Sequence, residues 1–458
     1  MVLNQIATIC KWRYSLYSIS LLMPSLILAS VLGYDYGVNE YFILILSAVL
    51  IVGLGFIIKT LRKSFTSLIG LMYCSCALFI WARPAYAIAT RDYSIFSITF
   101  GNTAILSGKL LCNLFMFWDI GIAAFFGGYM CFYKNAKYER VEFKTNVKSV
   151  YKIIFLSAIV FFYALLPFLV KEKIQAFSVG GYTALYMAQT GYSFNITRLV
   201  GFLCPLVFGL SIVINEKAYE KVALATVAIY AAAGLMVGQR IEAGIWIMTF
   251  VWYASNVKSM KISIKKLVIL FIVVGAFFES IEIIRERHSI GRSLITEFIV
   301  SQGVTFLLPS LMWNLPSPPM HAVLGEMLPL GGLYNLIGIG TTRDYNIANY
   351  ICAQNNPALF DAGYGLGSSA FIDMYYLCLE NYILYANGCF IAGIILCKIE
   401  KMAFQKSAMM LLLSVITPTL FAVQRRSIET LTSSCIYLIV PLALVFVCEH
   451  RYIYIKEI

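Results

Sequence analysis

Uninterrupted apolar stretches, separated by short polar segments, recur along the whole chain. Most are about as long as the 17–25 residues that an α-helix needs to cross a bilayer. They predict spans near residues 16–33, 41–58, 64–82, 110–132, 150–170, 197–214, 222–238, 241–256, 267–284, 370–397, 407–423 and 430–448. The runs 222–238 and 241–256 are short, which indicates tilted or broken helices. The pattern predicts an all-α, polytopic transmembrane bundle of about twelve helices.

The composition excludes other classes of protein. The 458 residues are 60% hydrophobic and 13% charged, whereas soluble domains contain about 25% charged residues. An ordinary soluble enzyme, a disordered chain and a coiled coil are therefore excluded. The 12 Cys lie mostly in apolar runs and are interpreted as packing residues. We expect one integral-membrane domain over residues 1–458, with a large loop at 285–369 that contains short interfacial or re-entrant pieces at 304–309 and 328–333.

Lys and Arg predict the orientation, because cytoplasmic loops carry an excess of both. Placing the N-terminus inside puts most of the 35 cations on inner segments, and an even number of spans leaves both termini in the cytoplasm. The net charge of +12 mostly reflects these loops and does not indicate nucleic-acid binding. The inner cations are mainly Lys, but the outer ones are mainly Arg: Arg83, Arg91, Arg198, Arg240, Arg285, Arg287, Arg292, Arg343, Arg425 and Arg426.

Arginine on the outer side has three interpretations. It forms ion pairs with outer carboxylates such as Glu286, Asp344 and Glu429, it reaches lipid phosphate without further function, or it binds an anionic ligand. The tight connections that carry Arg240, Arg425 and Arg426 favour a position at headgroup depth. We predict these three, together with Arg285, Arg287 and Arg292, as contacts for a diphosphate.

The start of the large loop offers acid–base groups. If the ninth span continues as a helix, Glu279, Glu282 and Glu286 share one face, and Arg285, His288 and Arg292 share another. Carboxylate and imidazole beside Arg are suited to proton transfer near a phosphate, although charges at a helix exit are usually just solvated. Glu282, Glu286 and His288 are the predicted catalytic candidates.

The end of the large loop is rich in glycine. Residues 363–371 read Gly-Tyr-Gly-Leu-Gly-Ser-Ser-Ala-Phe, without the Lys of a nucleotide-binding loop. Backbone N–H groups at such a helix start can bind an anion or a sugar hydroxyl. We predict substrate contacts at Arg343, Gly365, Gly367, Ser368 and Asp373. Within the expected span, Asp373, Glu380 and Asn387 recur every seven residues, and carboxylates inside a span are costly; Asp119 in the fourth span is similar.

Several signatures are missing from the sequence. No Asp-x-Asp motif is present, so a metal-bound nucleotide-sugar site has no support, and His288 and His321 do not form a zinc pattern. No internal repeat is visible, which weakens a transporter built on inverted repeats. We expect neither a metal nor a cofactor.

The layout resembles the O-antigen polymerases (Wzy), integral-membrane glycosyltransferases of the GT-C-like type. Residues 237–243 (Val-Gly-Gln-Arg-Ile-Glu-Ala) resemble the family's Gly-x-Arg turn before a span, and residues 363–371 resemble its Gly-rich loop exit. The resemblance implies polymerisation of polyprenyl-diphosphate-linked oligosaccharide units at the periplasmic face of a bacterial inner membrane. It implies a lipid-linked donor and acceptor as partners, a lipid diphosphate as leaving group and a chain-length regulator as a candidate protein partner.

Two other functions fit the same layout. An O-antigen ligase shares the chemistry, and His288 keeps this alternative open. A lipid-linked oligosaccharide flippase or other transporter would favour charged residues within several spans, whereas here the cations lie mainly outside them.

Overall fold

The computed structural model describes residues 40–62, 64–96, 108–132, 145–187, 196–236, 240–286, 298, 302–327, 342–344, 346–361 and 367–456. Within these ranges the chain forms helices and no strand, which confirms the all-α prediction. Six described helices are long and apolar enough to cross a membrane, and shorter apolar helices accompany them. The protein is a multi-pass membrane protein.

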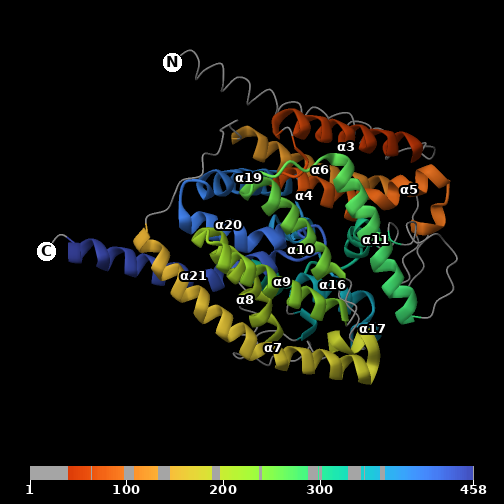
Figure 1. Cartoon of the computed structure of the whole chain (residues 1–458). Helices are drawn as coiled ribbons and strands as arrows, with labels where there is room; N and C mark the ends of the chain where they lie inside the picture. The colour runs from red at the N-terminus through yellow and green to blue at the C-terminus, as the bar shows by residue number, and fades with distance from the viewer. Residues whose placement is uncertain are drawn as a thin grey trace, which may run out of the picture.

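The helices follow the apolar runs of the sequence (Figure 1). The first part of the chain contains α3 (Glu40–Arg62), α4 (Leu68–Cys76), the π-helix η1 (Ala77–Trp81), α5 (Ala82–Thr90), η2 (Tyr93–Phe96), α6 (Gly108–Phe132), α7 (Thr145–Met187) and α8 (Ile196–Ile214). It continues with α9 (Lys217–Met236), α10 (Arg240–Trp252), the π-helix η4 (Tyr253–Val257) and α11 (Ile264–Glu286). The predicted span 16–33 lies outside the described residues.

The large loop folds into short helices, and long helices return after it. The described part of the loop contains η5 (Gly303–Leu307), α13 (Leu308–Met312), α14 (Met320–Met327), η6 (Thr342–Asp344), α16 (Ile347–Asn355) and α17 (Pro357–Asp361). After it come α18 (Ala370–Leu377), α19 (Tyr382–Ala403), α20 (Ser407–Leu420) and α21 (Ile428–Lys456). The predicted piece 304–309 is buried in the bundle, where Trp118 Nε1 donates to the Phe306 carbonyl at 2.9 Å. The piece 328–333 lies outside the described residues.

The prediction of one helix over 370–397 is wrong. Leu379 and Glu380 adopt left-handed backbone angles, with φ of 55° and 59°, and separate α18 from α19. Asn381 then begins α19 by accepting hydrogen bonds from the N–H groups of Ile383 and Leu384. Asp373, Glu380 and Asn387 therefore do not share one helix face. The apolar run predicted a long helix because local hydropathy does not reveal a reversal of direction.

Helices α6 and α19 pack closely against each other in the upper part of the view in Figure 1. A Cβ added at Gly128 would overlap the carbonyl of Phe390, and one added at Gly393 would overlap the carbonyl of Phe125. Small residues at these positions let the two backbones approach, as is common between membrane helices.

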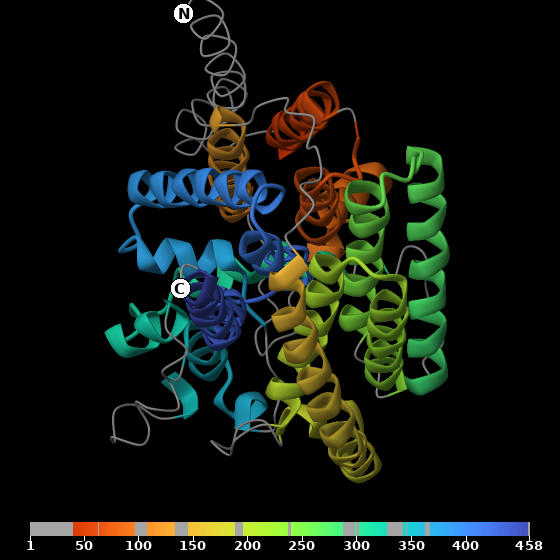
Figure 2. The ribbon, with the colours of Figure 1, turned by 60° about the vertical axis from the view of Figure 1, so that its left-hand side comes forward.

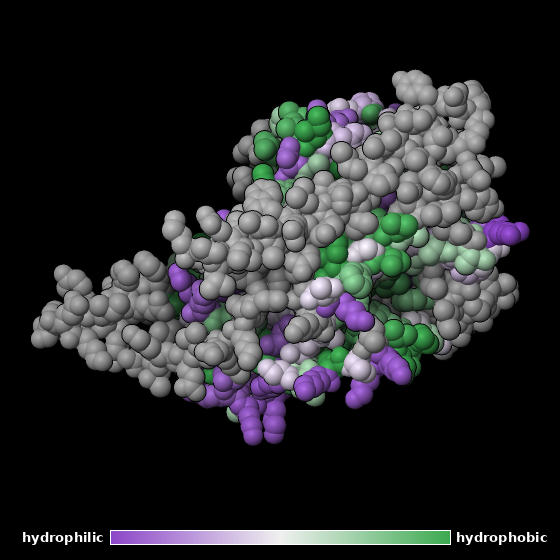
Figure 3. All heavy atoms as spheres, turned by 90° about the horizontal axis from the view of Figure 1, so that it is seen from above, coloured by the Kyte–Doolittle hydropathy of each residue, from purple (hydrophilic) through white to green (hydrophobic). Residues whose placement is uncertain are grey.

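Large apolar side chains cover the outside of the bundle. On α7, which runs diagonally along the lower edge in Figure 1, Val160, Phe161 and Phe168 are each about 60% exposed or more. The face in Figure 3 shows green apolar areas beside purple groups of hydrophilic residues. Exposed apolar surface of this extent is expected where a helix faces lipid.

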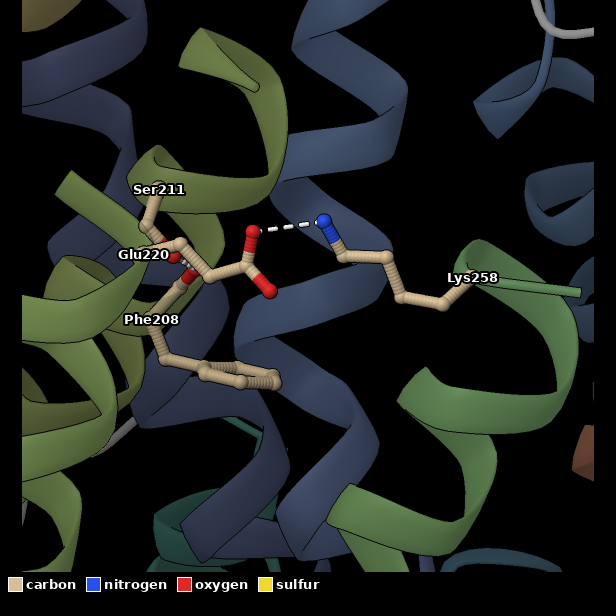
Figure 4. Close-up of polar contacts among 4 residues, drawn as sticks. All are labelled: Phe208, Ser211, Glu220 and Lys258. Atoms are coloured by element: carbon tan, nitrogen blue, oxygen red, sulfur yellow. Dashed lines mark hydrogen bonds and ion pairs between the residues drawn. The ribbon is translucent and has the colours of Figure 1, made fainter. Parts of the chain in front are cut away.

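Segments that the charge pattern assigns to the inner side meet in the structure. Lys258, directly after η4, forms an ion pair with Glu220 of the first turn of α9, with Nζ–Oε2 at 2.5 Å (Figure 4). Lys152 of α7 pairs with Glu216 at 2.8 Å. Both contacts join segments that the charge pattern places on the inner side, and the orientation itself stays a prediction.

Candidate functional site

The turn at residues 424–427 joins α20 to α21 and carries two of the predicted diphosphate contacts. Arg425 Nη1 donates a hydrogen bond to Oε1 of Gln302 at 2.5 Å. The same guanidinium lies 5.9 Å from the centre of the Phe79 ring. An amide oxygen and an aromatic ring thus both help to hold the Arg425 guanidinium in place.

Arg426 joins the turn to the beginning of α10. Its Nη2 forms an ion pair with Oε1 of Glu242, in the first turn of that helix. Arg240 is the first residue of α10, so its backbone lies in the same part of the fold, while its side chain lies outside what the structure describes. Two of the predicted arginine-bearing connections are therefore adjacent in space.

A buried glutamine anchors the turn to α4. Gln424 accepts a hydrogen bond from Ser75 Oγ at 2.8 Å and donates to Cys76 Sγ at 3.1 Å. Ser75 Oγ also donates to the carbonyl of Phe421, at the end of α20. This network fixes the position from which Arg425 and Arg426 project.

Three carboxyl groups gather around the N-terminus of α21, immediately after the turn. They belong to Glu326 of α14, Asp373 of α18 and Glu429 of α21, and all three residues are buried. Asp373 Oδ2 accepts from the Ile428 N–H at 2.7 Å, and Glu326 Oε2 accepts from the Glu429 N–H at 3.3 Å. Acidic groups are favourable at this end of a helix because its unpaired N–H groups carry positive partial charge.

Hydroxyl and amide groups complete this carboxyl cluster. Ser368 Oγ donates to Asp373 Oδ1 at 2.7 Å, and Ser427 Oγ donates to Glu326. Asn346 Nδ2 donates to Glu429 Oε2 at 3.0 Å. The cluster therefore joins the turn, the Gly-rich loop exit and two helices of the large loop.

Burial favours the protonated forms of two members of the cluster, which lie on helices too short to span a membrane. It raises the pKa of Asp373 to about 7, with the charge of Glu429 adding to the effect and three hydrogen bonds opposing it. Burial also raises the pKa of Glu326 well above its ordinary value, with further contributions from the charges of Asp373 and Glu429. Carboxyl groups with such pKa values can exchange protons near neutral pH.

The Gly-rich loop exit lies against the turn. Gly367 has a φ of 72°, which favours glycine, and a Cβ built there would lie 3.7 Å from the Arg425 carbonyl. Ser369 begins α18 by accepting from the Phe371 N–H. The structure thus brings the predicted residues Gly367, Ser368 and Asp373 to the same place as Arg425, while Gly365 lies outside the described residues.

Comparison with known proteins is consistent with this layout. The family model described as O-antigen polysaccharide polymerase Wzy matches residues 16–457, which is nearly the whole chain. The chain belongs to the O-antigen polymerase Wzy family. Neither a comparison with curated proteins nor one with solved structures gave a match. The family carries out O-antigen polymerisation, a glycosyltransferase-type activity, and its membership confirms the resemblance seen in the sequence.

The other arginines of this Wzy-family chain have different surroundings. Arg343 forms an exposed ion pair with Asp361 at 2.7 Å, which joins η6 to α17. Arg83 is buried, and its Nε donates to the carbonyl of Ile95 at 2.7 Å. Asp344, considered above as an arginine partner, lies 3.0 Å from His321 Nε2. An ion pair and a structural hydrogen bond thus account for Arg343 and Arg83, two of the arginines that the sequence places on the outer side.

The predicted catalytic residues remain predictions. Arg285 and Glu286 end α11, and Glu282 lies one turn earlier, so the helix does continue past the predicted span. Their side chains are not part of the described structure. Arg287, His288 and Arg292 lie outside the described residues altogether.

Three polar residues that the sequence did not single out lie at the turn or in the carboxyl cluster. Gln302 and Glu242 contact the two turn arginines, and Glu326 is the centre of the carboxyl cluster. A lone glutamate in the apolar stretch Met320–Met327 is a usable signal, because such a residue requires buried partners. Within the described residues, no group of three or more His, Cys, Asp or Glu could hold a metal ion.

Proposed function

We propose that this Wzy-family chain transfers a growing glycan from its polyprenyl diphosphate onto the next lipid-linked repeat unit, at the outer face of a bacterial inner membrane. The observation that carries the proposal is the arrangement of the 424–427 turn. It places Arg425 beside Gln302 and the Phe79 ring, directly next to the carboxyl cluster of Glu326, Asp373 and Glu429. Donor and acceptor are the partners.

Arg425 and Arg426 interact with the leaving group. In the transfer, the bond between the anomeric carbon and the diphosphate oxygen breaks, and a bond from that carbon to an acceptor hydroxyl oxygen forms. The electron pair of the broken bond remains on the lipid diphosphate, whose negative charge grows. Arg425 and Arg426 stabilise that charge in the transition state. Glu242 holds Arg426 in position through their ion pair. This electrostatic role needs no metal ion.

The acceptor hydroxyl loses its proton to a neighbouring base. Glu282, Glu286 and His288 are candidates from the sequence, at the end of α11. Asp373 is a candidate from the structure, because a carboxyl group with a pKa of about 7 is suited to accept a proton near neutral pH. Its position beside the turn, through the Ile428 N–H, supports that assignment.

Variants of Arg425 test the proposal in cells that lack the native gene. Arg425→Ala should leave the protein inserted but convert the surface polysaccharide ladder to single repeat units, and Arg425→Lys should restore part of the ladder because charge without the planar fork binds diphosphate less well. Lys171→Ala, an exposed cation on the same predicted side, is the matched control. Full-length ladders from Arg425→Ala would refute the proposed role.

The two alternative functions predict different products. Loss of a ligase would leave long polymer on its lipid carrier, and loss of a flippase would leave single units on the inner leaflet. Reconstituted protein in sealed vesicles should lengthen a lipid-linked oligosaccharide supplied on the site's own side.

A further inference from the structure

Two apolar cavities lie on opposite sides of a wall inside the bundle. The wall consists of α4 and η1 together with the end of α20, where the neighbouring residues Leu420 and Phe421 line different cavities. The hydrogen bonds of Ser75 with Gln424 and Phe421 hold the wall together. We call the spaces the α10–α11 cavity and the α18–α19 cavity.

The α10–α11 cavity is apolar except at one end. Its walls include Gly244 and Met248 of α10 and Phe271 and Val274 of α11, and Gln302 is its polar member. Helix α11 is the outer wall: it lies at the right-hand edge in Figure 2, and its Ile269 and Val273 are about 60% exposed on the far side. The cavity therefore lies one helix away from the lipid.

A cation marks the polar end of this cavity. Gln302 accepts the hydrogen bond from Arg425, and Phe79, another lining residue, lies under the Arg425 guanidinium. A molecule with a long apolar chain and an anionic head matches this order of surfaces, because the chain meets apolar walls and the head meets the cation.

The α18–α19 cavity has buried carboxyl groups, not an arginine, beside its polar end. Met327 and Ile428 line it. Met327 follows Glu326 in the chain, and the N–H of Ile428 donates a hydrogen bond to Asp373. A diphosphate placed there would meet carboxyl groups instead of arginine. Two apolar cavities of similar lining thus differ in the polar groups beside them, an arginine at one and buried carboxyl groups at the other.

We propose that the α10–α11 cavity binds the part of the donor's polyprenyl chain that lies next to the diphosphate, with the diphosphate at Arg425, and that the α18–α19 cavity does not bind this lipid. The inference rests on the proposed function and names the tail site of the same substrate. It also explains why Gln302, an amide instead of a carboxylate, lies at the junction of the cavity with the turn.

Photolabelling of the unchanged protein tests the inference directly. The probe is a polyprenyl diphosphate that carries a diazirine on its chain, added to the purified full chain in lipid nanodiscs. Label should appear in peptides from α10 and from residues 267–274, and excess polyprenyl diphosphate should remove it, whereas the polyprenyl alcohol or a phospholipid should not. Label in residues 392–399, or label that no diphosphate removes, would overturn the inference.

A matched pair of cavity-filling variants gives a second measurement. Gly244→Phe fills the α10–α11 cavity and should weaken binding of polyprenyl diphosphate by about tenfold or more, about 1.4 kcal/mol. Ala392→Phe fills the α18–α19 cavity and should leave the affinity unchanged. The reverse result would place the tail in the other cavity. If Gly244→Phe binds normally while Arg425→Ala still abolishes the ladder, the tail assignment is wrong and the proposed function stands; full ladders from Arg425→Ala refute the function whatever the labelling shows.

Discussion

The guanidinium of Arg426 forms an ion pair with the carboxylate of Glu242, across 184 positions of the sequence. The contact ties the turn after α20 to the start of α10, the two connections that carry Arg425, Arg426 and Arg240. The ion pair therefore holds the two connections next to each other.

This pair predicts a non-additive effect on polymerisation. Arg426→Ala leaves the Glu242 carboxylate beside the diphosphate, so the transfer rate should fall by about tenfold or more. The double variant Arg426→Ala with Glu242→Ala removes both charges and should recover part of that loss. Initial rates of chain extension in membranes measure the coupling. Equal rates in the single and double variants would show that the carboxylate does not act on the substrate.

Replacing Gln302 tests whether the net charge at Arg425 matters. Gln302→Glu has the same shape but places a carboxylate against the guanidinium, which should weaken polyprenyl diphosphate binding and shorten the ladder. Gln302→Ala removes the hydrogen bond but leaves the cation, so its loss should be smaller. Binding of the labelled lipid to both purified variants is the measurement, and stronger binding by Gln302→Glu would contradict it.

The raised pKa of Asp373 predicts that stability depends on pH. Unfolding lowers the pKa of Asp373 from about 7 to its ordinary value near 3.8. Between pH 3.8 and about pH 7, Asp373 is therefore more often protonated in the folded protein than in the unfolded chain. Stability from this group is fully present below pH 3.8 and is lost as the pH rises through about 7. Asp373→Asn should flatten this dependence of the melting temperature in detergent. An unchanged pH profile would place the proton elsewhere.

The α6–α19 contact predicts a stability effect without a change in chemistry. Gly128→Ala brings a Cβ onto the Phe390 carbonyl and should cost about 1–3 kcal/mol, because the backbone has to shift. Gly201→Ala is the control, since its Cβ would lie 3.3 Å from the Tyr230 hydroxyl and the ring can adjust. Melting temperatures of the two purified variants give the comparison. Equal temperatures would mean that α6 and α19 tolerate a wider spacing.

Local sequence was sufficient for the single helices but not for their reversals. The expected spans at 110–132 and 197–214 match α6 and α8, because each apolar run continues to a polar end. The expected span 370–397 does not match a single helix, because Leu379 and Glu380 adopt left-handed backbone angles that non-glycine residues rarely take. The backbone hydrogen bonds from the Leu379 and Glu380 N–H groups to Tyr376 and Tyr375 close the turn at that point.

The residues of the candidate site also divide into those that local sequence predicts and those that only the fold reveals. Arg425 and Arg426 could be predicted because charge in a short connection between apolar runs is visible locally. Gln302 and Glu242 could not, since each matters through a partner from another part of the chain. Glu326 could be suspected as a lone glutamate among apolar residues, but its partners could not be predicted.

Hydropathy by itself therefore determined that this chain is a helical membrane protein and where most of its long helices lie. Those properties depend on transfer of each segment into lipid, which nearby residues decide. The tertiary structure alone decided which cation meets an amide and which meets a carboxylate, and that three acidic groups surround one helix start. Such contacts join residues far apart in sequence, and their energies depend on burial that only the folded bundle creates.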